Sequence, residues 1–443
     1  MIWFIAALVA TCLVAFLAIQ FTVPFLAVTA GLIALSWLLR QGFWRASYAL
    51  VIFFTLGAIS SIGPWSSVST YGRVAAVALL LFATFATTSK GDAKPLGGLQ
   101  KWIFAFLGLL TVMAGVSAIW SASVSDTLIQ FALLAALLLV MNRLVRRRWV
   151  DRGTMVGDLR AGIIVLSVSM AAGIVTFYAG FLPPTFSGRF QGLFNNPNAA
   201  ALVAVVTLFI GWGVFLEKRS VVNLLLLASP LLTIALTETR TAFLAVVVGG
   251  LWIALRGGLR IFLTTLAVGV AVAILGVPLW QPVLARFGVV AAGDVYAGRT
   301  LGWATALELL QERPIGYGWG STQTVFASAY QSGASLFQPQ SIHNSYLQVA
   351  FEISWVGFGV MVLALAGVVV MILRQKPVGV EIGLSGAVVA GLIIHFSESA
   401  IFGTGQPYPW VYWFAVAGLM ASMTRHQPEW PVRSSRKALA RTS

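Results

Sequence analysis

The chain has 443 residues, of which 59% are hydrophobic and only 9% are charged. A soluble domain carries roughly a quarter of its residues as charged side chains, so this composition excludes an ordinary soluble protein. Apolar runs of about 16 to 22 residues recur along the length, and each is long enough to cross a hydrocarbon core of roughly 30 Å as a helix. These runs do not alternate in hydrophobicity as the strands of a membrane barrel would, so they predict an all-α polytopic membrane protein.

The predicted spanning segments follow one another along most of the chain. They lie at 2–19, 21–39, 46–62, 74–89, 102–119, 127–141, 161–181, 199–216, 221–236, 241–255, 261–277, 345–373, 383–397 and 410–424. The first segment has neither a basic leader nor a small-residue cleavage motif, and we interpret it as a spanning helix and not as a signal peptide. It contains Cys12, the single cysteine, so no internal disulfide is expected.

The formal net charge of +15 is distributed unevenly over the two sides of this topology. Alternate loops and the C-terminal tail carry 22 of the 28 basic residues. The opposite loops carry only six, which are Arg73, Arg189, Arg240, Arg286, Arg299 and Arg313. The positive-inside rule therefore predicts that both termini are cytoplasmic. The charge excess reflects topology and anionic lipid, and no nucleic-acid partner is expected.

A single membrane domain over 1–443 is expected, without a soluble domain or an internal repeat. The number of spans is about 12 to 14, because 221–236 and 241–255 are short enough to be merged or buried as a pair. One outer loop is long, from Pro278 to Ile342, and predicts a helix at 300–311 that ends before Pro314 and a glycine-rich stretch. Such a loop is usually functional or disordered, and its many aromatic residues favour an ordered cap formed by 278–344.

Two short outer connections carry an arginine each. In the first, Arg189 lies between glycines, and Asn196 is placed to cap the next helix with Pro197 in its first position. Free N–H groups at that helix start, beside an arginine, would suit an anion, although an ordinary interhelical loop fits equally well. In the second, Arg240 follows Glu238 at a membrane boundary, where it either binds a ligand or extends to the interface or to that glutamate.

Two further arginines belong to the long loop. Arg299 opens the predicted helix at 300–311, and Arg286 precedes it. An arginine at a helix N-terminus opposes the helix dipole, which makes more sense if an anion binds between them. Solvent exposure is the simpler explanation of either arginine alone.

The long loop returns to the membrane through Ser341-Ile342-His343-Asn344-Ser345. Of the three histidines, His395 lies in an apolar segment and His426 in the basic tail, which leaves His343 alone at the outer rim. Histidine exchanges protons near neutral pH, so His343 is the candidate general base, with a structural capping role as the alternative.

Several polar residues accompany His343. Asn344 adjoins it, and Gln348 and Glu352 are four positions apart on one helical face, where an intramembrane carboxylate is a functional candidate by default. Glu398 ends the penultimate span on the same side, and it either orients His343 or an arginine or is solvated. Arginine binds phosphate through its planar fork, and the natural anion at this depth is a phosphorylated lipid headgroup.

An ordered set of motifs over roughly residues 110–415 resembles the O-antigen ligase family. The set comprises Gly115-Val116-Ser117-Ala118-Ile119-Trp120-Ser121, Gly188-Arg189-Phe190 with Asn196-Pro197-Asn198, Thr239-Arg240-Thr241-Ala242, Gly298-Arg299-Thr300 with Trp303, Pro314 with Gly316 and Gly318, and His343-Asn344 with Gly357. The family usually has two glycines three apart in the helix after His-Asn. This chain has Ser354 at the first of these places, a departure that we expect to leave the helix assignment intact.

The resemblance implies a membrane glycosyltransferase of the C type, in the inner membrane, that moves a glycan from undecaprenyl diphosphate to an acceptor hydroxyl of a glycan or glycolipid at the periplasmic face. Arg189, Arg240 and Arg299 would hold the diphosphate, and His343 would activate the acceptor, with inversion at the anomeric carbon. The family needs no metal or other cofactor. The sequence itself has neither an Asp-x-Asp motif nor a Gly-x-x-x-x-Gly-Lys-Ser/Thr loop.

Alternatives remain within and outside this family. A polymerase would extend a lipid-linked O-antigen or exopolysaccharide chain, and a protein O-oligosaccharyltransferase would modify a protein. A transporter or flippase would place charges along a mid-membrane path, often on discontinuous helices. Here the charges gather at one rim, with Glu352 as the exception, which favours an enzyme.

Overall fold

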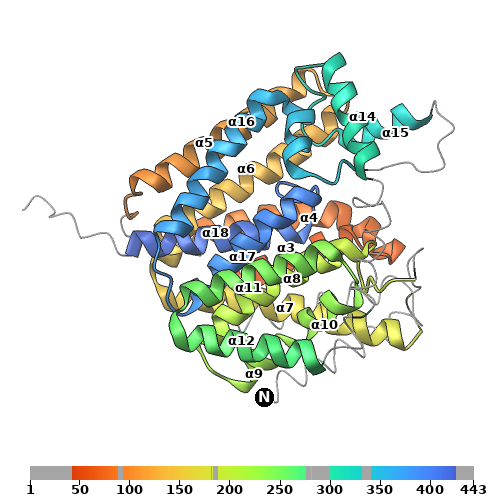
Figure 1. Cartoon of the computed structure of the whole chain (residues 1–443). Coiled ribbons are helices and arrows are strands. Elements are labelled where there is room, and N and C mark those ends of the chain that lie inside the picture. Colours follow the sequence, from red (N-terminus) through yellow and green to blue (C-terminus); the bar gives the residue numbers. More distant parts are fainter. Residues whose placement is uncertain are drawn as a thin grey trace, which may run out of the picture.

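The computed structural model describes residues 42–87, 93–180, 182, 188–275, 281, 299–331 and 341–425. All regular secondary structure within these ranges is helical, which confirms the all-α polytopic class (Figure 1). The segments expected at 2–19 and 21–39, together with Cys12, Arg286 and His426, lie outside the described residues.

The longer described helices coincide with the predicted segments from 46–62 onwards. They are α3 Phe43–Ala58, α4 Gly63–Thr87, α5 Gly98–Val116, α6 Val124–Arg146, α7 Arg152–Tyr178, α8 Pro197–Glu217, α11 Arg240–Arg256, α12 Gly258–Leu275, α16 Ser345–Arg374, α17 Val380–Ser397 and α18 Pro407–Arg425. By length and composition, seven of the described helices suit a membrane span: α4, α5 with its short extension to Ile119, α6, α7, α8, α16 and α17.

Two predictions about the segments need correction. The segment at 221–236 is two short helices, α9 Val221–Leu225 and α10 Ala228–Leu236, and not one span. Arg73 lies inside α4 and not in a loop, because the serine-rich stretch before it continues the helix back to Gly63.

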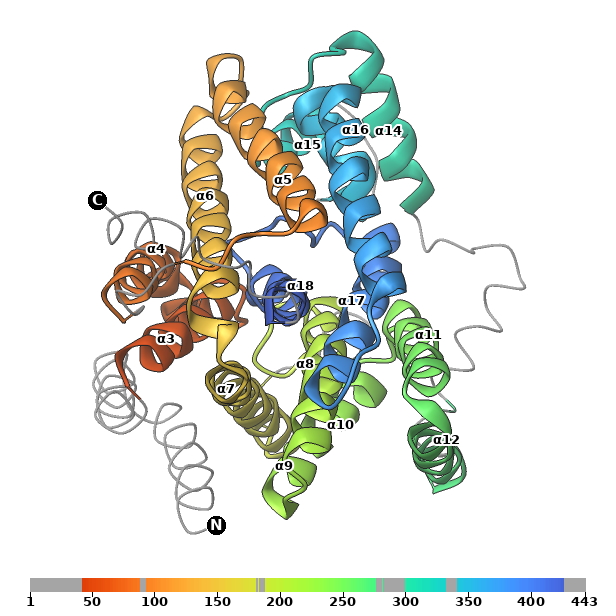
Figure 2. The same cartoon turned by 90° about the vertical axis from the view of Figure 1, so that its left-hand side faces the viewer.

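Helix α18 lies at the centre of the bundle, with α3, α6, α8 and α17 around it (Figure 2). Its aromatic side chains Trp410, Tyr412 and Trp413 are almost completely buried. The neighbouring pair α8 and α17 packs through glycines, since a Cβ atom on Gly383 would lie only 2.3 Å from a backbone oxygen of α8. Small residues allow this close approach, which is how helices associate in lipid.

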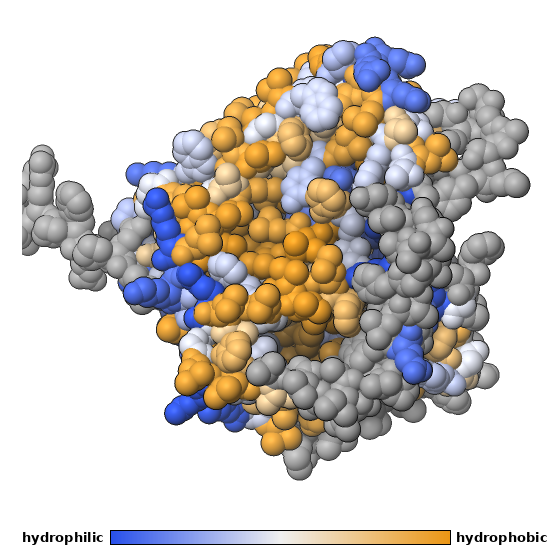
Figure 3. Space-filling model, viewed as in Figure 1, coloured by the Kyte–Doolittle hydropathy of each residue, from blue (hydrophilic) through white to orange (hydrophobic). Residues whose placement is uncertain are grey.

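The basic helix termini gather on one side of the bundle. Hydrogen bonds join them to one another: Lys94 N to Arg146 O at 3.0 Å, Arg425 Nη1 to Trp149 O at 2.8 Å, Arg256 Nη2 to Leu373 O at 2.9 Å and Arg152 Nη2 to Val378 O at 3.0 Å. In the view of Figure 3, a broad apolar surface crosses the middle of the molecule, and hydrophilic residues gather towards its edges. This is the surface that a membrane-embedded bundle presents.

The described part of the long loop forms two helices at the opposite side. Helix α14, Arg299–Glu312, agrees closely with the helix predicted at 300–311, and α15 covers Thr322–Gln331. A small apolar cluster, which includes Phe326 and Phe351, packs this loop against α16. The described residues of the loop therefore form an ordered structure on the bundle.

Helix α16 is broken at Ile353 and Ser354, where the backbone leaves the helical conformation. The break leaves backbone carbonyl groups of α16 without helical partners, and the turn between α14 and α15 donates hydrogen bonds to them. Tyr317 N donates to Phe351 O at 3.1 Å, and Gly318 N donates to Glu352 O at 2.9 Å. The helix predicted over 345–373 is therefore present as α16, but it is kinked at Ile353 and Ser354. The break satisfies the loop's N–H groups, and the serine adopts a φ of 74° to make it.

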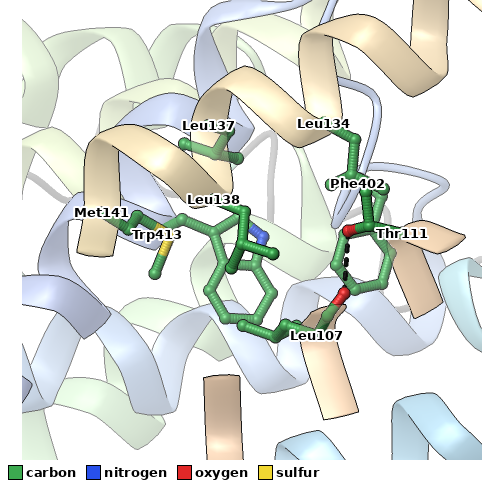
Figure 4. A pocket seen from close by; sticks show the side chains of 8 residues that line it. All are labelled: Leu107, Thr111, Leu134, Leu137, Leu138, Met141, Phe402 and Trp413. Carbon is green, nitrogen blue, oxygen red and sulfur yellow. Dashed lines mark hydrogen bonds between the residues drawn. The ribbon is translucent and has the colours of Figure 1, made fainter. Parts of the chain in front are cut away.

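A small apolar crevice lies where α5 and α6 meet Phe402 and Trp413 (Figure 4). Its one polar side chain is Thr111, whose hydroxyl donates to Leu107 O of the same helix at 2.8 Å. The crevice therefore offers nothing to a charged ligand.

Candidate active site at the rim of the bundle

Glu398 lies at the centre of a polar network, directly after the last residue of α17. Its side chain is 7% exposed and accepts hydrogen bonds at both oxygens. Oε2 lies 3.0 Å from His343 Nδ1, and Oε1 accepts from Arg299 Nη2 at 2.5 Å. Asn198 Nδ2 donates to the same Oε1 at 3.0 Å. Three segments that are distant in sequence thus meet at one carboxylate.

The network continues from Asn198 to Arg189. Arg189 Nη2 donates to Asn198 Oδ1 at 3.2 Å and to Thr239 Oγ1 at 2.8 Å. The same nitrogen and Nε both donate to Thr237 O, at 2.6 and 2.9 Å. One edge of the Arg189 fork therefore faces protein acceptors, and it holds the turn between α10 and α11 against the start of α8.

Local sequence explains this placement of Arg189. Gly188 and Gly192 both have positive φ, at 72° and 59°, a conformation that glycine adopts without strain. Asn196 caps α8 by accepting from Asn198 N at 2.8 Å, and Pro197 occupies the first helical position. The predicted cap is thus confirmed, and it presents the Asn198 side chain to Glu398.

Arg240 is the first residue of α11 and lies between two residues of this region. Before it, Thr239 bonds Arg189. After it, Thr241 Oγ1 accepts from the hydroxyl of Ser397 at 2.8 Å, and Ser397 directly precedes Glu398. The α11 start that carries Arg240 is therefore fixed beside the Glu398 network.

His343 is held by the segment that follows α17. Asn344 caps α16 by accepting from Tyr346 N and Leu347 N, and its own N–H donates to Ser399 Oγ at 3.2 Å. Ser345 Oγ donates to Glu398 O at 2.6 Å. His343 itself has a φ of 52°, which is uncommon for a residue other than glycine. Its side chain is 31% exposed, so the imidazole is accessible while its carboxylate partner is not.

Gln348 and Glu352 form a separate cluster further along α16. Gln348 Nε2 donates to Glu352 Oε1 at 2.8 Å, as their spacing predicts, and Thr322 Oγ1 donates to the same oxygen at 2.7 Å. The backbone N–H groups of Gly320 and Thr322 also face this carboxylate. Glu352 is 2% exposed and is sealed by the turn before α15, so it is not a carboxylate open to the membrane.

The structure thus brings together most of the residues singled out from the sequence. Arg189, Arg299, His343 and Glu398 belong to one network, Asn344 and Arg240 adjoin it, and Arg286 lies outside the described residues. Reasoning from sequence missed the contributions of Asn198 and Thr237. A signal for Asn198 was present in the capping motif, whereas Thr237 acts through its carbonyl group and leaves no trace in sequence.

Fold and site together define a polytopic helical membrane protein with a histidine–glutamate–arginine network at one rim of its bundle. Residues 223–362, from α9 into α16, match the family model of O-antigen ligase. The matched region contains Arg240, Arg299 and His343. The family indicates a glycan-transferring enzyme of the ligase or polymerase type. No protein in the curated set that was searched matches the chain.

Proposed function

We propose that the protein transfers a glycan from undecaprenyl diphosphate to an acceptor hydroxyl at the periplasmic face of the inner membrane, as an O-antigen ligase does. The observation that carries this proposal is the pairing of His343 with Glu398 beside Arg299. An accessible base, a buried carboxylate and arginines in one place suit a reaction in which a hydroxyl loses its proton and a diphosphate leaves.

His343 is the proposed general base. With Nδ1–H donated to Glu398, the other ring nitrogen, Nε2, is unprotonated and takes the proton of the acceptor hydroxyl. The acceptor oxygen bonds to the anomeric carbon as the bond from that carbon to the diphosphate oxygen breaks. One displacement of this kind inverts the anomeric centre and releases undecaprenyl diphosphate.

Arg299 and Arg240 are the proposed diphosphate ligands, and Arg189 assists. The Nε and Nη2 edge of Arg189 is committed to Thr237, so this residue contributes mainly its positive charge. Arginines that stabilise the charge developing on a leaving group typically contribute about 3–4 kcal/mol each. Charge distribution supports the orientation, because the basic helix termini lie on the opposite side.

A reconstituted transfer assay tests the function. Purified protein is given a glycan on undecaprenyl diphosphate and a lipid A-core acceptor, without ATP, and the products are separated by mass. Glycan attached to the acceptor is the expected result. A longer lipid-linked chain would identify a polymerase instead, and intact donor that crosses the bilayer without a new glycosidic bond would identify a transporter.

His343→Ala is the matched variant in this assay. Removal of a general base typically lowers the rate by about 10²–10⁴-fold. We expect a loss in that range with normal membrane insertion and an unchanged elution profile. A wild-type rate would remove the assignment of His343 as the base.

A further inference from the structure

A second cationic position lies at the same rim, apart from the Glu398 network. Arg73 is within α4, a helix that suits a membrane span, and its side chain is half-buried. Its Nη1 donates to Gly405 O at 3.2 Å, whereas its Nε is buried without a hydrogen-bond partner. Gly405 belongs to the connection between α17 and α18 that begins at Glu398. A guanidinium held in this way near lipid is costly and marks a functional candidate.

Gln130 of α6 directs its amide to the same place. A Cβ atom on Gly405 would lie 2.5 Å from Arg73 Nη1 and 3.5 Å from Gln130 Nε2, so the two nitrogens converge over one glycine. The carbonyl oxygen of Gln130 is occupied by the Thr404 hydroxyl, at 3.4 Å. Gln130 therefore offers its N–H groups beside the guanidinium, and both groups are donors.

Among the described residues, no carboxylate forms an ion pair with Arg73. Asp126, in the first turn of α6, is near enough to act on it electrostatically, but it is exposed and accepts a hydrogen bond from the Ser123 hydroxyl at 2.6 Å. A cation and an amide that converge in this way match a phosphate, which accepts from a guanidinium and has oxygens left for further donors.

We propose that Arg73 and Gln130 form an anion site for a lipid-borne phosphate. Two lipids could supply that group, a phosphorylated glycolipid acceptor or a bilayer phospholipid. The first source rests on the proposed transferase function. With a glycolipid acceptor as the source, the acceptor phosphate binds at Arg73, on the other side of the 398–406 connection from His343. The donor diphosphate and the acceptor phosphate are then held by different arginines.

Charge neutralisation at each position distinguishes this site from a purely structural pair of Arg73 with Asp126. An anion site loses affinity in Arg73→Gln and gains affinity in Asp126→Asn, because the aspartate repels the ligand. A structural pair is weakened equally by both changes, and neither change affects lipid binding. Arg313→Gln is the matched control, since Arg313 is bonded to Trp120 O at 2.6 Å and lies over the Tyr317 ring.

The first measurement is lipid retention by the full-length protein in native mass spectrometry. The probes are a phosphorylated lipid A-core glycolipid, its dephosphorylated form and phosphatidylglycerol. We expect Arg73→Gln to weaken binding of the phosphorylated probes about tenfold, which corresponds to about 1.4 kcal/mol. Asp126→Asn should strengthen it, and Arg313→Gln should leave it unchanged. Wild-type affinity in Arg73→Gln, or weaker binding in Asp126→Asn, would overturn the site.

The second measurement identifies the source of the phosphate. If the acceptor supplies it, Arg73→Gln raises KM for the phosphorylated acceptor about tenfold and leaves kcat and the donor KM near wild type, since one charge-assisted contact is lost. The dephosphorylated acceptor should not distinguish the variant from wild type. Altered lipid binding with unchanged kinetics assigns the site to a bilayer phospholipid. If the wild-type protein transfers no glycan, the proposed function fails, while lipid retention still decides the site.

Discussion

Glu398 is the residue on which the candidate site depends, because donors from three segments share its two oxygens. It fixes the ring orientation of His343 and at the same time holds Arg299. Sequence analysis left open whether Glu398 orients a partner or is solvated. In the structure, each of its two carboxylate oxygens has a hydrogen-bond partner. The Glu398 side chain, which forms an ion pair with Arg299, is only 7% exposed.

Glu398→Gln is therefore expected to impair transfer severely. Glutamine has one acceptor oxygen, so either His343 or Arg299 must face an amide N–H group in place of an acceptor. Loss of a residue that orients a functional group typically costs 10–100-fold, and we expect a fall of about 100-fold in kcat. Initial rates at saturating donor and acceptor measure it, with Arg219→Gln, at an exposed position on the opposite side, as a surface control. A rate within twofold of wild type would mean that Glu398 does not orient the base.

At the scale of the elements, sequence predicted most of the helices and missed the breaks. Hydrophobic length is sufficient to locate α6, α8 and α17, because each lies in one uninterrupted apolar run. The interruption between α9 and α10 has a local signal that the predicted span overlooked: Pro230 lies in the first turn of α10 and disrupts the helical hydrogen bond to Leu226. The break in α16 depends on a turn more than thirty residues earlier in the chain, and only the folded arrangement reveals it.

The backbone of Ser354 is strained at this break, and the free energy of this strain can be measured. Its φ of 74° and ψ of 170° lie in a region essentially reserved for glycine, where other residues cost about 1–3 kcal/mol. Its hydroxyl also accepts from Val356 N at 3.2 Å and so caps the second half of α16. Replacing a capping serine with glycine costs only a few tenths of a kcal/mol.

Ser354→Gly should therefore raise the apparent Tm, and Ser354→Ala should lower it. Glycine relieves the strain at a small capping cost, whereas alanine keeps the strain and loses the cap, at roughly 1 kcal/mol. Thermal unfolding of both variants in one detergent at one scan rate tests the pair. A helix that is continuous through this position would show the opposite order, since alanine favours a helix over glycine.

Glu352 ties the turn before α15 to the broken helix. Four donors face its carboxylate: the side chains of Gln348 and Thr322 and the N–H groups of Gly320 and Thr322. Glu352→Gln should destabilise the protein even though the size is conserved, because the new amide group places a donor against donors. A buried group left without a partner costs about 1–3 kcal/mol.

Apparent Tm and protease sensitivity of the turn at 313–322 measure this effect. Gln348→Ala is the control, because it removes one donor and leaves the carboxylate with the other three. We expect its effect to be clearly smaller than that of Glu352→Gln. Equal stability of Glu352→Gln and wild type would show that the carboxylate does not hold the turn.

At the scale of the whole molecule, the described helices begin and end on two opposite sides of the bundle. The candidate site lies on the side with few basic residues. Basic termini from α6, α11, α16 and α18 meet on the other side. The site needs contributions from the starts of α8, α11, α14 and α16 and from the end of α17. Sequence order alone could assign these ends to one side, but it could not show that Arg299 contacts Glu398 directly and that Arg189 reaches it through Asn198.

The orientation of the whole molecule follows from this division and is testable with single cysteines. In a Cys12→Ser background, Glu308→Cys places a thiol on the exposed surface of α14, and Arg219→Cys places one at the exposed connection after α8. A membrane-impermeant maleimide added to intact spheroplasts should label the first and not the second. After permeabilisation both should react, because both positions are exposed. The positive-inside rule predicts this result, because it places the basic termini in the cytoplasm and His343 at the opposite face of the membrane. Labelling of Arg219→Cys alone in intact spheroplasts would invert the molecule and place the His343 network on the wrong side of the membrane for the proposed transfer.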